Sequence, residues 1–142
     1  MKLFLDTNVW LRYFLRDQEE HFKSCLTLFE YIEQGKIQPY TSSIVFLEIQ
    51  YVLEKVYEVE KKIVQKHIEQ AFGMRKLTII DKTVFKDAWK LHIQKKVKLS
   101  DSLIATQIPS HVILCTFDQA LLKLGTVIAH TPREIVGKLT NA

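Results

Sequence analysis

Residues 3–8 read LFLDTN, a short apolar run that ends at a polar triplet. The apolar run is typical of a buried strand, and Asp, Thr and Asn all favour the position just before a helix. Apolar and aromatic side chains then recur at helical spacing over residues 9–14. This stretch therefore predicts a strand, a polar turn and a helix, which together form the first unit of an alternating α/β fold.

The same alternation continues along the rest of the chain. Apolar periodicity predicts helices over residues 18–34, 44–57, 60–72, 82–96, 100–107 and 118–124, with a last helix opening at residue 131. Short runs of β-forming residues predict strands over residues 37–40, 77–80, 111–115 and 126–129. Strands and helices joined by short connections predict a three-layer α/β/α domain with a central, mostly parallel five-stranded sheet. We expect residues 1–142 to form one domain.

The composition is that of a compact globular protein, since the 142 residues are 47% hydrophobic and 25% charged, with 4 Gly and 3 Pro. These values exclude collagen-like and low-complexity classes. The formal charge of +4 is compatible with an anionic partner. Cys25 and Cys115 lie far apart without a zinc-ligand spacing, and no uncharged apolar run approaches the roughly 18 residues that cross a bilayer. We therefore expect a cytoplasmic protein without a membrane segment.

Four acidic residues stand where an α/β domain collects its functional groups. Asp6 and Asp118 follow strands, while Glu48 and Asp101 occupy early turns of helices that leave the same sheet edge. Each acid also has a simpler interpretation. The three aspartates can stabilise helix starts, and Glu48, which shares its helix face with apolar neighbours, can extend its carboxylate to water. The simpler interpretations do not predict that all four meet at one edge.

Carboxylates gathered in one crevice repel one another, and a hard divalent cation relieves that repulsion. Mg²⁺ and Mn²⁺ prefer oxygen ligands, and Mg²⁺ usually keeps several waters and is completed by substrate phosphates. Two such ions can activate a water molecule and neutralise the leaving oxygen of a phosphodiester. The acidic residues therefore predict a metal-dependent nuclease.

Four short motifs carry a resemblance to a known family: LFLDTN at residues 3–8, Glu48 within an apolar helix, LSDSLIA at residues 99–105 and CTFD at residues 115–118. In this order and within one domain of this size, they resemble the PIN-domain family, and most closely its VapC-type toxin ribonucleases from prokaryotic toxin–antitoxin pairs. The resemblance implies a five-stranded parallel sheet, Mg²⁺- or Mn²⁺-dependent cleavage of single-stranded RNA, and a homodimer. It also implies inhibition by a cognate antitoxin whose tail enters the acidic groove.

The same resemblance assigns roles to individual residues. By match to the motifs, the catalytic, metal-binding acids are Asp6, Glu48, Asp101 and Asp118, and the polar groups that support them are Asn8 and Thr116. Many relatives carry another acid shortly after the position of Asp118, whereas residues 119–121 here are Gln-Ala-Leu. Mechanisms with one metal ion and with two metal ions therefore both stay open.

Cationic residues near the acids are candidates for substrate binding. Arg12 lies on the helix after Asp6, and Lys96 and Lys98 precede Asp101, so these side chains can line a path for RNA phosphates. The alternative is a solvated basic face, because exposed helices are routinely rich in lysine.

The aromatic residues of the first helices exceed what one small core obviously needs. They are Trp10, Tyr13, Phe14, Phe22 and Phe29. We expect part of this surplus to form a surface patch, which agrees with the homodimer that the family resemblance implies.

Other functional classes find less support in the sequence. No H-E-x-x-H pair, G-x-S-x-G elbow or phosphate-binding glycine loop is present. An aspartyl phosphatase would need a second carboxylate two residues after the first, where this chain has Asn8. The alternative that stays open is a non-catalytic or decayed PIN-like module that binds nucleic acid or protein.

Overall fold

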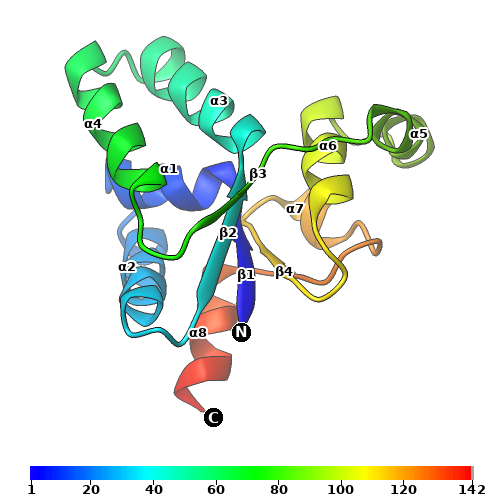
Figure 1. Cartoon of the computed structure of the whole chain (residues 1–142). Coiled ribbons are helices and arrows are strands. Elements are labelled where there is room, and N and C mark those ends of the chain that lie inside the picture. The colour runs from blue at the N-terminus through cyan, green and yellow to red at the C-terminus, as the bar shows by residue number, and fades with distance from the viewer. Residues whose placement is uncertain (142) are drawn as a thin grey trace.

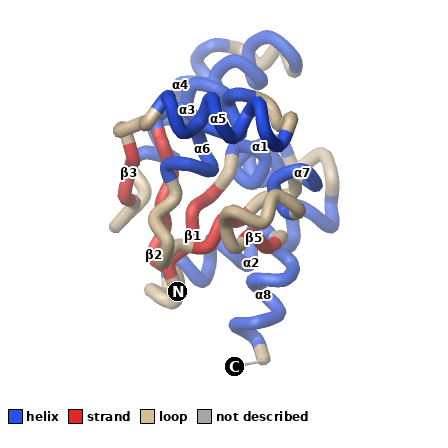
Figure 2. Tube along the Cα trace, turned by 90° about the vertical axis from the view of Figure 1, so that its right-hand side faces the viewer, coloured by secondary structure: helices blue, strands red, loops and turns tan. Residues whose placement is uncertain are grey.

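The computed structural model describes residues 1–141 and contains a five-stranded parallel sheet. The strands are β1 (Lys2–Leu5), β2 (Gln38–Ser42), β3 (Thr78–Ile80), β4 (Ile113–Cys115) and β5 (Ala129–His130). Their order across the sheet is β3-β2-β1-β4-β5, and every pairing is parallel. Figure 2 shows the strands as red segments among the helices. The predicted five-stranded parallel sheet is confirmed, and its strand order reverses between β1 and β4.

Helices cover both faces of this sheet (Figure 1). They are α1 (Thr7–Leu15), α2 (Glu19–Glu33), α3 (Ser43–Tyr51), the π-helix η1 (Val52–Val56), α4 (Lys61–Phe72), α5 (Phe85–Lys95), α6 (Leu99–Gln107), α7 (Gln119–Leu122) and α8 (Pro132–Thr140). In Figure 1, α1, α2 and α8 lie on one side of the strands and α5, α6 and α7 on the other, which confirms the three-layer architecture. No helix within residues 1–141 combines the length and apolarity that a membrane span requires.

Strand β1 lies at the centre of the sheet and begins the site. Its residues Leu3, Phe4 and Leu5 expose no surface, because helices cover both faces. Beyond the strand, the backbone N–H of Asp6 donates to the carbonyl of Cys115 at 3.1 Å. The polar residues that follow these two neighbouring strands, Asp6 and Thr116, therefore lie side by side where the strand order reverses, which is where open α/β sheets bind ligands.

The helix predicted over residues 44–57 changes its geometry part of the way along. Regular α3 ends at Tyr51, and in η1 the N–H of Tyr57 donates to the carbonyl of Val52, five residues back, at 3.1 Å. This wider turn changes the direction of the side chains that follow it. The Tyr57 hydroxyl here accepts a hydrogen bond from Nη2 of Arg12 at 3.2 Å. Because η1 is only five residues long, it is too short to leave its own apolar periodicity in the sequence.

Several other boundaries differ from the sequence prediction by one to three residues, and two of these differences have a local cause. The last strand forms at Ala129–His130 rather than over residues 126–129, since the turn at Gly125, whose φ is 81°, delays the return of the chain to the sheet. Helix α5 begins at Phe85 rather than at residue 82, because Val84 has an extended backbone, with φ −113° and ψ 87°.

Candidate active site

Asp6 is the most deeply buried of the four predicted acids. It caps α1, with Oδ1 accepting from the N–H of Thr7 at 2.8 Å, and only 4% of the residue is exposed. Its other oxygen, Oδ2, accepts from the Thr116 hydroxyl at 2.7 Å. The carboxylate is therefore fixed both by its own helix and by the neighbouring strand.

Thr116 connects three of the residues that the motifs singled out. Besides donating to Asp6, its oxygen accepts from Nδ2 of Asn8 at 3.3 Å and from the backbone N–H of Asp118 at 3.0 Å. Asn8 also accepts from the N–H of Phe117 at 3.2 Å, which holds the segment between Thr116 and Asp118 against α1. The structure thus brings Asp6, Asn8, Thr116 and Asp118 into one hydrogen-bonded group.

Asp118 keeps part of its carboxylate available. Its Oδ1 accepts from the N–H groups of Ala120 and Leu121 at 2.8 and 3.1 Å, so it caps α7 as the simpler interpretation predicted. The structure records no partner for Oδ2 among residues 1–141. A capping carboxylate with one free oxygen can still bind a cation on its outer side.

Glu48 is joined to the same group by a residue that the sequence analysis did not select. The hydroxyl of Thr7 donates to Oε1 of Glu48 at 2.9 Å, and the nearby Ser100 side chain lowers the pKa of this carboxylate. Thr7 and Ser100 lie inside the motifs at residues 3–8 and 99–105, next to Asp6 and Asp101. In the sequence, only their position beside acidic residues indicated a role in the site. The contact between Thr7 and Glu48 could not be predicted, because it joins residues 41 positions apart.

The four acids influence one another electrostatically. The pKa of Asp6 is raised from 3.8 to about 7, mainly because burial removes water from its carboxylate, and the charges of Glu48 and Asp101 add to this while its hydrogen bonds oppose it. The pKa of Asp101 is raised to about 6, first by burial and then by the charges of Asp118 and Glu48. Burial also raises the pKa of Glu48. The charges of Glu48 and Asp118 thus act on Asp101, and those of Glu48 and Asp101 act on Asp6, so the acids form one electrostatic group.

The donor set suits a hydrated Mg²⁺ or Mn²⁺ ion. Every candidate ligand is an oxygen, and within residues 1–141 none of the four acids forms an ion pair. Within the same residues, no three acidic, histidine or cysteine side chains are close enough together to hold a metal ion directly. Mg²⁺ in enzymes is usually held by only one or two carboxylates and several waters. The residues therefore fit such an ion but do not form a closed cage.

The predicted cationic residues lie in different surroundings. Lys98 immediately precedes α6, and its charge lowers the pKa of both Glu48 and Asp101, so it lies beside the acids. Lys96 is exposed at the end of α5, where its φ is 55°. Arg12 is 8% exposed, and its Nη1 and Nη2 donate to Asp17 at 2.7 Å and to the Tyr57 hydroxyl at 3.2 Å. Arg12 is therefore bonded to Asp17 and Tyr57 and not to any of the four acids of the site.

The acids gather at the carboxyl ends of the central strands of a parallel α/β sheet, where such sheets bind their ligands. Residues 3–126 match the family model of the PIN domain, so the chain belongs to the PIN-domain family. Members of this family are generally nucleases, which places the protein among hydrolases that act on nucleic acids. The family resemblance of the motifs is thereby confirmed.

Three solved structures have a similar fold. VapBC2 from Rickettsia felis, bound to a DNA fragment from its promoter, has a TM-score of 0.65 and 23% identity, covering 92% of this chain and 98% of that chain. FitAcB from Neisseria gonorrhoeae has a TM-score of 0.63 and 18% identity, covering 94% and 99%. A toxin–antitoxin complex from Klebsiella pneumoniae has a TM-score of 0.61 and 20% identity, covering 92% and 97%. The comparison with curated proteins gives no match.

Proposed function

We propose that this protein is a Mg²⁺- or Mn²⁺-dependent endoribonuclease that cleaves single-stranded RNA, and that it acts as the toxin of a toxin–antitoxin pair. The observation that carries the proposal is a set of four carboxylates without ion-pair partners among residues 1–141, grouped around buried Asp6 at the switch point of the sheet. A buried carboxylate is costly unless something compensates its charge. A divalent cation supplies that compensation.

The roles of the residues follow from their contacts. Asp6, Glu48, Asp101 and Asp118 would hold the ion, one or two of them directly and the others through its bound waters. When bound, the ion would activate a water and neutralise the leaving oxygen. The hydroxyls of Thr116 and Thr7 fix the carboxylates of Asp6 and Glu48, and Asn8 fixes the segment that carries Asp118. Lys98, beside Glu48 and Asp101, and the exposed Lys96 are placed to attract RNA phosphates.

The test is cleavage of a mixed single-stranded RNA pool by protein first stripped with EDTA and then supplied with Mn²⁺. We expect cleavage with Mn²⁺ and none in EDTA, and we expect Asp6→Asn to abolish it, because this change removes a charged oxygen ligand at constant side-chain size. Asp87→Asn, at an exposed acid on α5, is the matched control and keeps activity. Full activity in EDTA would contradict the mechanism. A folded protein that binds Mn²⁺ poorly and cleaves no RNA would instead be the non-catalytic PIN-like module.

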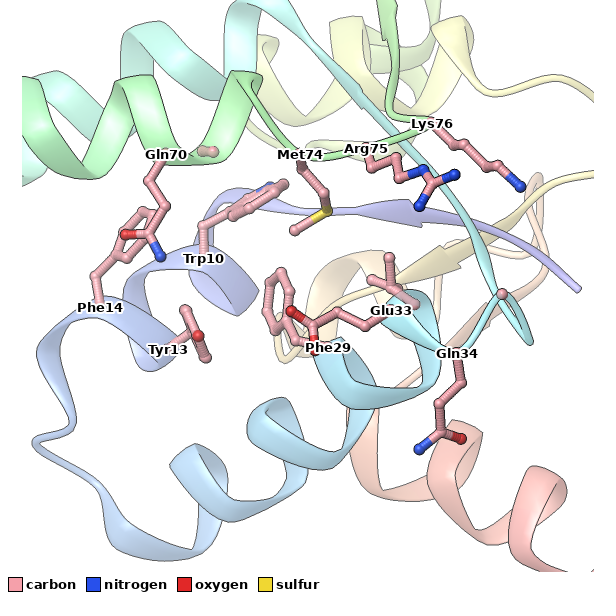
Figure 3. Close-up of a pocket in the computed structure, with 13 residues that line it drawn as sticks. Trp10, Tyr13, Phe14, Phe29, Glu33, Gln34, Gln70, Met74, Arg75 and Lys76 are labelled. Carbon is pink, nitrogen blue, oxygen red and sulfur yellow. The ribbon is translucent and has the colours of Figure 1, made fainter.

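A cognate antitoxin is the second partner that we propose, and a pocket outside the acidic site supports it. This pocket, of about 570 Å³, lies between α1, α2 and α4 (Figure 3). Trp10, Tyr13 and Phe29 line it, with Arg75 at its rim. An antitoxin segment with apolar side chains would fill this pocket against the aromatic rings. Met74→Glu, which puts a charge within the pocket, tests this in a co-purification assay.

For the homodimer we propose a contact surface outside the aromatic residues of α1 and α2. The aromatic residues of α1 and α2 pack on one another, with ring centroids of Tyr13 and Phe29 4.4 Å apart and those of Trp10 and Phe29 5.2 Å apart. Exposed apolar residues lie on several elements, among them Leu47 and Tyr51 on α3 and Phe72 on α4. Three of them are grouped on α5, where Phe85, Trp89 and Ile93 are 54%, 48% and 58% exposed. We place the dimer contact on this face of α5. Sedimentation that gives a dimer for the wild type and a monomer for Trp89→Glu tests it.

A further inference from the structure

A second pocket lies at the carboxyl edge of the sheet, beside the acidic site. Its volume is about 390 Å³, within the range of about 300–1,000 Å³ that is typical of ligand pockets. Its walls come from the first turns of α2, from the segment between β4 and α7, and from the start of α8. None of the four acids lines it, so it is separate from the site described above.

One wall of this pocket consists of stacked rings. The ring of His21 lies on that of Phe117, with centroids 4.3 Å apart and planes inclined by 22°. Phe117 is the residue between Thr116 and Asp118, and its backbone N–H donates to Asn8. The wall and the acidic site are therefore built on the same short segment. A strand of RNA that passes over this segment would contact both.

The charge of the pocket complements a phosphate group. Lys23 and Arg133 line it together with a single carboxylate, that of Glu20. Arg133 forms no ion pair with any residue from 1 to 141, and Lys23 has only an exposed contact of 3.5 Å with Glu19. Exposed ion pairs of this kind are weak, so both cations are available to an incoming anion.

We propose that this pocket is a subsite for one nucleotide of the RNA strand next to the cleaved bond. Lys23 and Arg133 bind its phosphate, and its base stacks against the pair formed by His21 and Phe117. Arginine and lysine are the usual phosphate ligands, and aromatic platforms bind bases of any sequence. This subsite rests on the proposed ribonuclease function, because it specifies how the same substrate lies on the protein.

The experiment measures binding of a fluorescein-labelled, single-stranded 12-nucleotide RNA in the Asp101→Asn background, which removes cleavage. Fluorescence anisotropy at several KCl concentrations gives the Kd and its salt dependence. Arg133→Gln is expected to weaken binding about fivefold at low salt. It should also reduce the slope of log K against log salt by about 0.7, the value for one phosphate contact on a single strand.

His21→Ala distinguishes stacking from charge. It is expected to weaken binding about fivefold or more while leaving the salt slope unchanged, because stacking releases no counterions. Lys138→Gln, which removes an exposed cation from the same helix as Arg133 but outside the pocket, is the matched control and should bind like its parent. In the cleavage-competent protein, Arg133→Gln should raise KM and leave kcat unchanged.

The outcomes separate the subsite from the ribonuclease proposal. If the protein binds and cleaves RNA but Arg133→Gln and His21→Ala behave like Lys138→Gln, the subsite is wrong and the ribonuclease function stands. If Arg133→Gln binds RNA normally but no longer binds the antitoxin, the pocket is a protein contact and the subsite is again wrong. If the protein neither binds nor cleaves any RNA, both proposals are wrong.

Discussion

Replacing Asp6 with asparagine should reverse the relative stabilities of mutant and wild type between acid and alkaline pH in the metal-free protein. The pKa of Asp6 is about 7 in the folded protein and ordinarily 3.8. Because the folded value is the higher one, protonation favours the native state, and this contribution is lost as pH rises through about 7. At about 1.36 kcal/mol per pKa unit, ionised Asp6 destabilises the metal-free fold by roughly 4 kcal/mol at pH 8.

Asparagine avoids this penalty but loses part of the local hydrogen bonding. An asparagine amide has only one oxygen, and its NH2 group cannot accept a hydrogen bond. A donor such as the Thr116 hydroxyl, which donates to Asp6 at 2.7 Å, would then lose its acceptor, at a cost of about 1 to 2 kcal/mol. We therefore expect Asp6→Asn to be about 1 kcal/mol less stable than wild type at pH 4 and roughly 2 to 3 kcal/mol more stable at pH 8.

Urea unfolding in EDTA at pH 4, 6 and 8 measures both free energies. Asp87→Asn, at an exposed acid, serves as the control and should differ little from wild type at any pH. Saturating Mn²⁺ at pH 8 should stabilise wild type much more than Asp6→Asn, since only the native wild-type site binds the ion fully. A stability difference between Asp6→Asn and wild type that stays constant from pH 4 to 8 would refute the assignment of a raised pKa to Asp6.

Three further changes probe the same site. Asp101→Asn should abolish cleavage. It should also raise the melting temperature of the metal-free protein at pH 8, because burial and neighbouring acids raise the pKa of Asp101 to about 6. A lower melting temperature at pH 8 would contradict this. Glu48→Gln should reduce the melting-temperature gain on adding Mn²⁺, and an unchanged gain would remove Glu48 from the metal site. Thr116→Val should destabilise the fold by about 1 to 3 kcal/mol in urea unfolding, since it leaves the partners of one buried hydroxyl unpaired, and a neutral effect would show that those hydrogen bonds contribute little.

The parts of the fold that depend on local patterns could be predicted from the sequence. The run at residues 3–5 is continuously apolar because β1 is buried on both faces, and Asp6 caps the helix that follows it. In a parallel sheet the carboxyl ends of all strands lie at one edge, so the polar residues that follow the strands lie there too. Asp6 and Asp118 could be selected for this reason before any contact was known, and Glu48 and Asp101 because their helices leave the same edge of the sheet.

The parts that depend on distant contacts could not be predicted. Thr7 could have been selected as a candidate because it lies next to Asp6. Its role, however, depends on the hydrogen bond from its hydroxyl to Glu48, which the sequence does not reveal. Arg12 lies near Asp6 in sequence, but the left-handed backbone at Arg16, with φ 55°, turns the chain so that Asp17 meets its guanidinium. No pattern along a single helix reports such a turn.

The hydrogen bond between Thr116 and Asp6 has a consequence for the time at which the protein becomes active. Its two partners are 110 residues apart in the chain, so a ribosome that adds about 5–20 residues per second needs roughly 5 to 20 s to pass from one to the other. During that interval the nascent chain carries Asp6 but lacks Thr116 and Asp118. Strand β4 pairs directly with β1, so the acidic site forms only when β4 joins the sheet. On the proposed function, a nascent chain shorter than 118 residues would therefore be inactive, and an antitoxin translated nearby would have these seconds to accumulate.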